Sequence, residues 1–120
     1  MPAHSANLKD NLSRRHEIQI SVTGRKSGRT ISNPVWFVAE GDTLYLVPVK
    51  GSDTQWYKNV LSKPTMTIEA GGASAEIKPV PITDSKQVAS IVDKFRAKYG
   101  AGDVKKYYSK FDVAIDAHIP

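Results

Sequence analysis

The feature of this 120-residue chain that most restricts its fold is a change in the spacing of its apolar residues. From residue 17 to about residue 80, apolar and polar residues alternate in short runs broken by glycine or proline, which is typical of half-buried strands. From residue 84 to 100, apolar residues recur at helical spacing. Strands joined by short turns and followed by helices predict an α+β fold, built on an antiparallel sheet or a small barrel.

Six runs have the composition of strands. They are EIQISVT (17–23), ISNPVWFVAE (31–40), TLYLVPV (43–49), TMTIEA (65–70), SAEIKPV (74–80) and, as a candidate last strand, DVAIDAHIP (112–120). Pro34 lies inside the second run. Because proline cannot donate to a ladder, we expect this residue on an edge strand or at a bulge.

Three segments have the signals of helices. They are TQWYKNVLSKP (54–64), DSKQVASIVDKFRAKYG (84–100) and GDVKKYYSKF (102–111). Thr54 is a candidate N-cap of the first, Asp84 or Ser85 of the second, and Pro64 and Gly100 are stop signals. The sequence therefore predicts one short helix in the middle of the chain and one or two near the C-terminus.

Length and composition indicate one domain over residues 17–120, preceded by a tail or short helix over residues 1–16. The chain has no cysteine and no apolar run long enough to cross a membrane, so we expect a cytoplasmic protein without disulfides. Its net charge of +5 and pI near 9.5 favour anionic partners and are compatible with peripheral contact to an acidic membrane. The three histidines are not at the spacing of metal ligands, so no metal site is predicted.

The segment VTGRKSGRT (22–30) places three cations in a turn between two predicted strands. It is not a Walker A loop, because Lys26 follows Arg25 instead of glycine, and it is not a Rossmann fingerprint, because a strand follows it. We expect Gly24 and Gly28 to adopt positive φ, so that backbone N–H groups and nearby cations can surround one anion. The alternative is a solvated turn whose charges serve solubility.

Five aromatic residues stand among cations along the chain: Trp36, Trp56, Tyr57, Tyr107 and Tyr108. Such residues can stack on nucleic-acid bases or on a flat cofactor, and they can equally be core residues. The helical phase of Trp56 favours the core.

The ordered combination of TGRKSGR, NPVW, KGS and WYKN resembles the deazaflavin-dependent nitroreductase family of the flavin/deazaflavin oxidoreductases. The likeness is strongest over residues 17–79. It implies a split β-barrel that binds coenzyme F-420, a deazaflavin with an anionic phosphate and oligoglutamate tail.

The resemblance also implies a set of site residues. Those for the cofactor are Arg25, Lys26, Ser27, Gly28 and Arg29 at the phosphate and tail, Asn33, Pro34 and Val35 along the ring, Lys50, Gly51 and Ser52 as a second polar wall, and Trp56 and Asn59 on the short helix. Trp36 would face the substrate, and Tyr107 or Tyr108 would cover it. The candidate proton donors are Tyr57, Tyr107, Tyr108 and solvent. Ile31 stands where many relatives have a further basic residue.

We therefore expect a reductase that passes hydride to a small redox acceptor, namely a quinone, a nitroaromatic or an activated alkene. Because Ile31 weakens the basic site, the alternatives are a non-catalytic carrier of a fatty acid or pigment and a relative that binds flavin mononucleotide (FMN). The ordered motifs do not favour nucleic acid as a partner. A homodimer is consistent with the wider superfamily.

Overall fold

The computed structural model of this protein describes residues 8, 11–12 and 15–119. Eight strands in this part form two antiparallel sheets, with the orders β2-β1-β5-β6 and β3-β4-β8-β7. The strands are β1 (Ile18–Thr23), β2 (Thr30–Val35), β3 (Val38–Glu40), β4 (Thr43–Leu46), β5 (Met66–Ala70), β6 (Ala73–Ile77), β7 (Val80–Ile82) and β8 (Ala114–His118). The helices are the 3-10 turn η1 (Gly51–Asp53), α2 (Gln55–Ser62), α3 (Ser85–Tyr99) and α4 (Ala101–Tyr107).

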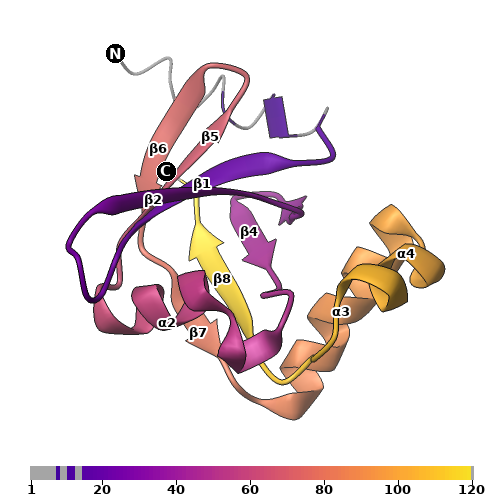
Figure 1. The fold of residues 1–120 in the computed structure, drawn as a ribbon. Coiled ribbons are helices and arrows are strands. Elements are labelled where there is room, and N and C mark those ends of the chain that lie inside the picture. The colour runs from indigo at the N-terminus through magenta and orange to yellow at the C-terminus, as the bar shows by residue number, and fades with distance from the viewer. Residues whose placement is uncertain (1–7, 9–10, 13–14, 120) are drawn as a thin grey trace.

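The inner faces of the two sheets enclose the main core of the barrel. Alternate residues of the strands supply it, including the fully buried Ile20, Leu44, Ile68 and Ile115. The apolar face of α2 joins this core through Trp56 and Val60, so the short helix packs against the barrel (Figure 1). Leu8 and Leu12 are also buried in it, whereas most of the predicted N-terminal segment 1–16 lies outside the described residues.

A second apolar cluster lies on the outer face of the second sheet. Its members from α3 and α4 are Val88, Ile91, Val92, Phe95 and Val104, and they pack with Val38 and Ala114 of the sheet. Figure 1 shows α3 and α4 together on one side of the barrel. Asp84 caps α3 as expected, because its carboxylate accepts from the Gln87 N–H at 3.0 Å. None of the helices described is long and apolar enough to span a membrane.

The run 31–40 was expected to form one strand, and this prediction is wrong. It forms β2 and β3, which belong to different sheets and are separated by Trp36 and Phe37. The reason is packing: Phe37 is buried in the barrel core, whereas Trp36 and Val38 pack in the outer cluster. Pro34 does lie on an edge strand, since β2 pairs only with β1.

The run 74–80 is divided in the same way. It ends β6 at Ile77, and after Pro79 the chain begins β7 in the other sheet, where it pairs with β8. Proline interrupts the ladder and so permits the crossing. The predicted last strand is present as β8.

Candidate functional site

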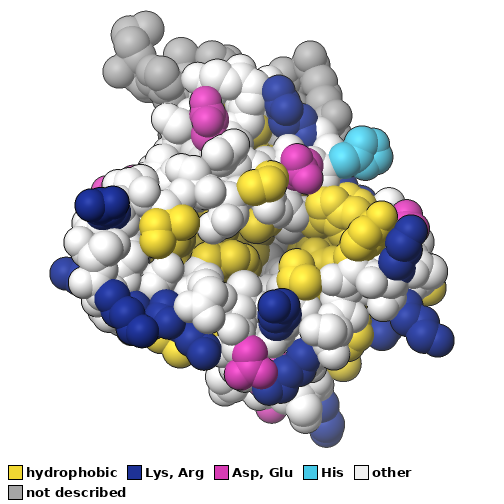
Figure 2. Space-filling model, in the orientation of Figure 1, with side chains coloured by type: hydrophobic (Ala, Val, Ile, Leu, Met, Phe, Trp, Pro, Cys, Tyr) yellow, Lys and Arg dark blue, Asp and Glu magenta, His cyan; other side chains and the backbone are white. Residues whose placement is uncertain are grey.

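A groove of about 500 Å³ opens where the edge strand β2 meets the first turn of α2 and the end of α4. Its lining consists of Glu17, Asn33, Pro34, Val35, Trp36, Val47, Val49, Thr54, Trp56, Tyr107 and Tyr108. Figure 2 shows hydrophobic side chains in a hollow on this face, with charged side chains around it. The groove can therefore hold a flat apolar molecule and expose its polar parts to the rim.

The crossing between the sheets forms one wall of the groove. Trp36 stacks on Tyr99, with ring centroids 4.3 Å apart and planes 7° apart. Its ring centroid lies 5.5 Å from that of Tyr107, which it meets edge to face. The centroid of Tyr108 lies 5.9 Å away. These contacts fix the indole of Trp36 in the wall, because three rings from α3 and the end of α4 surround it.

The backbone of Phe37 is held by the end of α3. The Phe37 N–H donates to the Tyr99 hydroxyl at 3.0 Å, and Lys98 Nζ donates to the Phe37 carbonyl at 2.9 Å. The Tyr99 proton is shared between the carbonyls of His16, at 2.6 Å, and Phe37, at 2.8 Å. Burial lowers the pKa of Lys98 to about 8. The end of α3 thus satisfies the backbone groups that the strand break leaves free.

The basic turn, residues 24–29, is bonded to α2, the helix whose first turn lines the groove, although no residue of the basic turn is itself among the lining residues. The Arg25 guanidinium donates to Asn59 Oδ1 at 2.8 Å and to Gln55 Oε1 at 2.8 Å, and the Arg25 N–H also donates to Asn59 Oδ1, at 3.1 Å. Asn59 is only 4% exposed. Arg25 therefore attaches the turn to α2, and Asn59 is used in that attachment and lies outside the groove lining.

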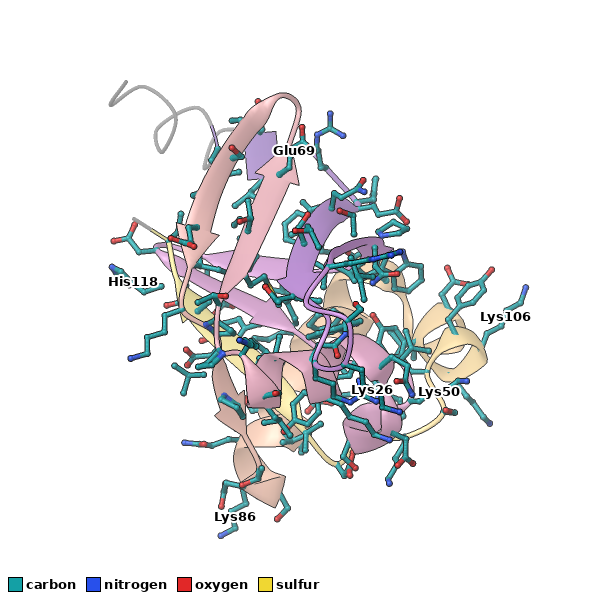
Figure 3. The ribbon with its side chains drawn as sticks, turned by 60° about the vertical axis from the view of Figure 1, so that its left-hand side comes forward. Lys26, Lys50, Glu69, Lys86, Lys106 and His118 are labelled. Carbon is teal, nitrogen blue, oxygen red and sulfur yellow. The ribbon has the colours of Figure 1, made fainter. Side chains whose placement is uncertain are left out.

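Two cations of the basic turn remain open to solvent. Lys26 and Arg29 are exposed, and among the described residues their side chains have no hydrogen bond or ion pair. Ser27 Oγ accepts from the Arg29 N–H at 3.2 Å, which leaves its proton free to donate. Figure 3 shows Lys26 and Lys50 near α2.

The glycines of the basic turn act differently from each other. Gly28 has φ +71° as expected, but the expectation of a positive φ at Gly24 is wrong. Gly24 is needed for close packing, because a Cβ there would lie 2.8 Å from Ser27 Oγ. Its N–H donates to the Arg29 carbonyl and the Gly28 N–H to the Gly24 carbonyl. Four of the six backbone N–H groups of the turn, those of Gly24, Arg25, Gly28 and Arg29, thus donate within the protein. Those of Lys26 and Ser27 have no acceptor among the described residues, so they can bind an anion together with the side chains.

The KGS loop, residues 50–52, is held by the segment that follows α4. Asp112 accepts from the Ser52 N–H at 3.0 Å and from the Ser52 hydroxyl at 2.6 Å. Lys110 Nζ lies 3.2 Å from Asp53 Oδ2 and 3.5 Å from Asp112 Oδ2. The Lys50 N–H donates to Thr54 Oγ1 at 2.8 Å, so the threonine that precedes α2 holds the loop and does not cap the helix.

Seven of the residues expected at the site line the groove. They are Asn33, Pro34, Val35, Trp36, Trp56, Tyr107 and Tyr108. Tyr57 is not among the lining residues: it is 2% exposed in the barrel core, and burial, with a smaller effect of Asp112, raises its pKa. Tyr108 is also buried, and burial, followed by the effect of Tyr99, raises its pKa.

Sequence reasoning missed several residues of the groove. Val47 and Val49 were assigned to a strand, and Thr54 to a helix cap, yet all three line the groove. Glu17 lines it as well, and Tyr99 supports Trp36 from behind. Only Tyr99 had a usable signal, because it extends the apolar face of the longest helix to its last residue. No group of three or more potential metal ligands occurs in the described part of the chain.

Comparison with known families and curated proteins gives one match. The family model described as "Uncharacterized protein conserved in bacteria (DUF2255)" matches residues 9–114. No curated protein matches.

Solved structures match over nearly the whole chain. A reductase dependent on reduced coenzyme F-420 (FDR-A) is 19% identical, with a TM-score of 0.68 over 87% of this chain and 95% of its own. A protein described as a domain-swapped dimer is 17% identical, with a TM-score of 0.68 over 98% of this chain and 100% of its own. The heme storage protein HutZ from Vibrio cholerae is 13% identical, with a TM-score of 0.69 over 96% and 88%.

At these identities the likeness shows a common fold. The predicted α+β split barrel is confirmed. One of these neighbours is a reductase dependent on reduced coenzyme F-420, so the chain has the fold that the resemblance indicated by the motifs implies.

Proposed function

This chain belongs to the DUF2255 family, and we propose that it is an oxidoreductase that binds a reduced deazaflavin in the groove and reduces an electron-poor acceptor there. The observation that carries the proposal is the junction of two unlike surfaces. A groove with a mainly apolar lining and a turn whose Lys26 and Arg29 have no partner among the described residues are both joined to the start of α2, although no residue of the turn lines the groove. A planar ring with an anionic tail requires this combination.

The residues present fit such a cofactor at both of its parts. Lys26, Arg29 and the Ser27 hydroxyl would bind the phosphate and tail, and Lys50 would add a fourth donor from the adjoining loop. The backbone of Asn33 to Val35 would face the polar edge of the ring, because β2 is an edge strand of the sheet in the described part of the chain. Trp56 and Val49 would cover its apolar surface.

Three residues are left out of this proposed contact set. Arg25 and Asn59 bind each other, and the Ser52 hydroxyl donates to Asp112. Their part in cofactor binding is indirect: they keep the basic turn on α2 and the KGS loop on the C-terminal segment. Gly51 and Gly28 allow the two loops their positive φ values of 56° and 71°.

When bound, the reduced deazaflavin would supply a hydride from C5, so the protein needs no acid-base pair to generate one. The chain's own residues orient the two reactants and limit access of water. Trp36 presents its indole to the acceptor side of the groove, and Tyr107, which is 52% exposed, has the accessible hydroxyl there. Tyr108 is a poor proton donor, because burial raises its pKa.

A carrier of a fatty acid or heme-like pigment is the second candidate. The apolar lining of the groove favours it, and so does the likeness in fold to a protein described as storing heme. FMN is the alternative redox cofactor.

Titration of the purified protein with coenzyme F-420 and with FMN tests the proposal. We expect F-420 fluorescence to change on binding, and the reduced form to be oxidised when a quinone or nitroaromatic is added. Mass spectrometry of the protein as isolated identifies any co-purified lipid or pigment. A bound lipid, with no response to either cofactor, would favour the carrier.

For assembly and location we propose a cytoplasmic homodimer. The absence of cysteine favours the cytoplasmic location. The split-barrel neighbour that is described as a domain-swapped dimer favours the homodimer. Light scattering with crosslinking would measure the oligomeric state.

A further inference from the structure

Among the described residues that line the groove, Glu17 is the only charged one. We propose that the end formed by Glu17 and Trp36 selects flat aromatic cations as acceptors over neutral or anionic rings of the same shape. The proposal rests on the proposed function only in assigning this end to the acceptor, because the basic turn takes the anionic cofactor. Neither the sequence motifs nor the fold neighbours assign a role to Glu17.

Glu17 is exposed and lines the groove together with Trp36, Tyr107 and Tyr108. Within the described residues, its carboxylate has no hydrogen bond or ion pair. Burial raises the pKa of Tyr99 to about 12 against the effect of its hydrogen bond to Phe37, and the charge of Glu17 adds to the rise. The carboxylate therefore lies close enough to act on the hydroxyl behind Trp36.

The aromatic wall adds a second preference for positive charge. The face of an indole ring carries negative potential and attracts a cation, typically about twofold to fivefold in affinity at an exposed site. One face of Trp36 is stacked on Tyr99, and the residue still lines the groove. Lys106 Nζ already lies 5.3 Å from the centre of the Tyr107 ring. Trp36 and the more exposed Tyr107 are therefore both rings of the wall that a ligand in the groove meets.

The cations near Glu17 lie outside the groove lining. Arg15 shares with Glu17 a neighbouring hollow, but it does not line the groove. Lys98 donates to the Phe37 carbonyl and also lies outside the lining. Glu17 is thus the only charged lining residue of the groove among those described. An acceptor bound beside Trp36 would meet this negative charge.

This charge pattern suits an acceptor such as an N-alkylated heteroaromatic ring. Such a ring gains a hydride at a ring carbon, with two electrons and one hydrogen, while the reduced deazaflavin is oxidised and releases the proton of its ring N–H to solvent. No proton from the protein is needed, and the product is neutral. It would lose its attraction to Glu17 and leave more easily than the substrate.

Three rings of one shape test the selection without any deazaflavin: 1-methylnicotinamide as the cation, nicotinamide as the neutral molecule and nicotinate as the anion. Binding is followed by NMR through the indole N–H signals. We expect the cation to bind about fivefold to twentyfold more tightly than the anion. In Glu17→Gln, this ratio should fall to about twofold. Glu76→Gln, which removes an exposed carboxylate from β6, should keep the wild-type ratio.

An unchanged ratio in Glu17→Gln overturns the inference, and so does equal binding, or no binding, of all three rings to the wild type. The F-420 titration separates this result from the proposed function. Charge selection without F-420 binding leaves the inference standing and removes the proposed cofactor. F-420 binding without charge selection supports the proposed cofactor and overturns the inference.

Discussion

The basic turn and the KGS loop were both expected to present polar groups to an anionic cofactor, yet their side chains are used differently. In the basic turn, Arg25 is bound to α2, and Lys26 and Arg29 are without partners among the described residues. In the KGS loop, Ser52 donates to Asp112, and Asp112 also forms an ion pair with Lys110. The basic turn therefore presents exposed cations to solvent, whereas the Ser52 side chain of the KGS loop is hydrogen-bonded within the protein.

The difference shows that residue type alone does not decide whether a polar side chain is available to bind a ligand. Both loops contain glycine, serine and lysine at the tip, and both have a glycine with positive φ. The KGS loop meets an acidic residue about sixty positions later in the chain, whereas the basic turn meets only neutral amides of α2. We therefore expect substitutions in the KGS loop to affect stability and those in the open part of the basic turn to affect binding.

The largest effect on stability is expected for Gly51→Ala. Gly51 has φ +56°, and a Cβ there would collide with Asp112 and crowd Lys110. The strained backbone alone costs about 1–2 kcal/mol in free energy of unfolding. Urea denaturation measures this loss, and Gly72→Ala is a control with a positive φ but open space around its Cβ. Equal losses in the two variants would show that the contact with Asp112 does not matter.

A smaller loss is expected for Arg25→Ala. The change removes two side-chain hydrogen bonds and leaves the buried Asn59 Oδ1 with one donor fewer, which costs about 1–2 kcal/mol. Lys26→Ala, one residue away and exposed, should change stability by less than about 0.5 kcal/mol. If the two variants unfold at the same urea concentration, Arg25 does not attach the turn to α2.

The smallest effect concerns pH. Burial disfavours the ionised Asp112 carboxyl, but hydrogen bonds from Ser52 and the charge of Lys110 outweigh it and lower its pKa. The stability from this group is thus present above the unfolded pKa, near 3.8, and is lost as pH falls through the lower folded value. Because Asp112 is partly exposed, we expect less than about 1 kcal/mol. Asp112→Asn should lose stability at pH 6 and should differ little from the wild type at pH 2, and an equal deficit at both would contradict this account.

The strand runs, the longest helix and the last strand could be predicted from the sequence, because each has a clear period or cap. The crossing at Trp36 and Phe37 could not, since the five consecutive apolar residues 35–39 fit a buried strand as well as a passage between sheets. At the site, the motifs located the turn and Pro34. They could not reveal that Asn59 and Ser52 have partners inside the protein, because those partners are distant in sequence. Glu17 was missed because an isolated glutamate before a strand has no signal.

The most direct test of the open cationic turn is a titration of coenzyme F-420 into three proteins: the wild type, Lys26→Ala with Arg29→Ala, and Ser52→Ala. Each charge-assisted contact to phosphate contributes about 1.5–3 kcal/mol, reduced by solvent at this exposed site. We predict that the double variant binds at least about tenfold more weakly, whereas Ser52→Ala stays within about threefold of the wild type. Equal affinity of the wild type and the double variant, or a larger loss in Ser52→Ala, would contradict the account.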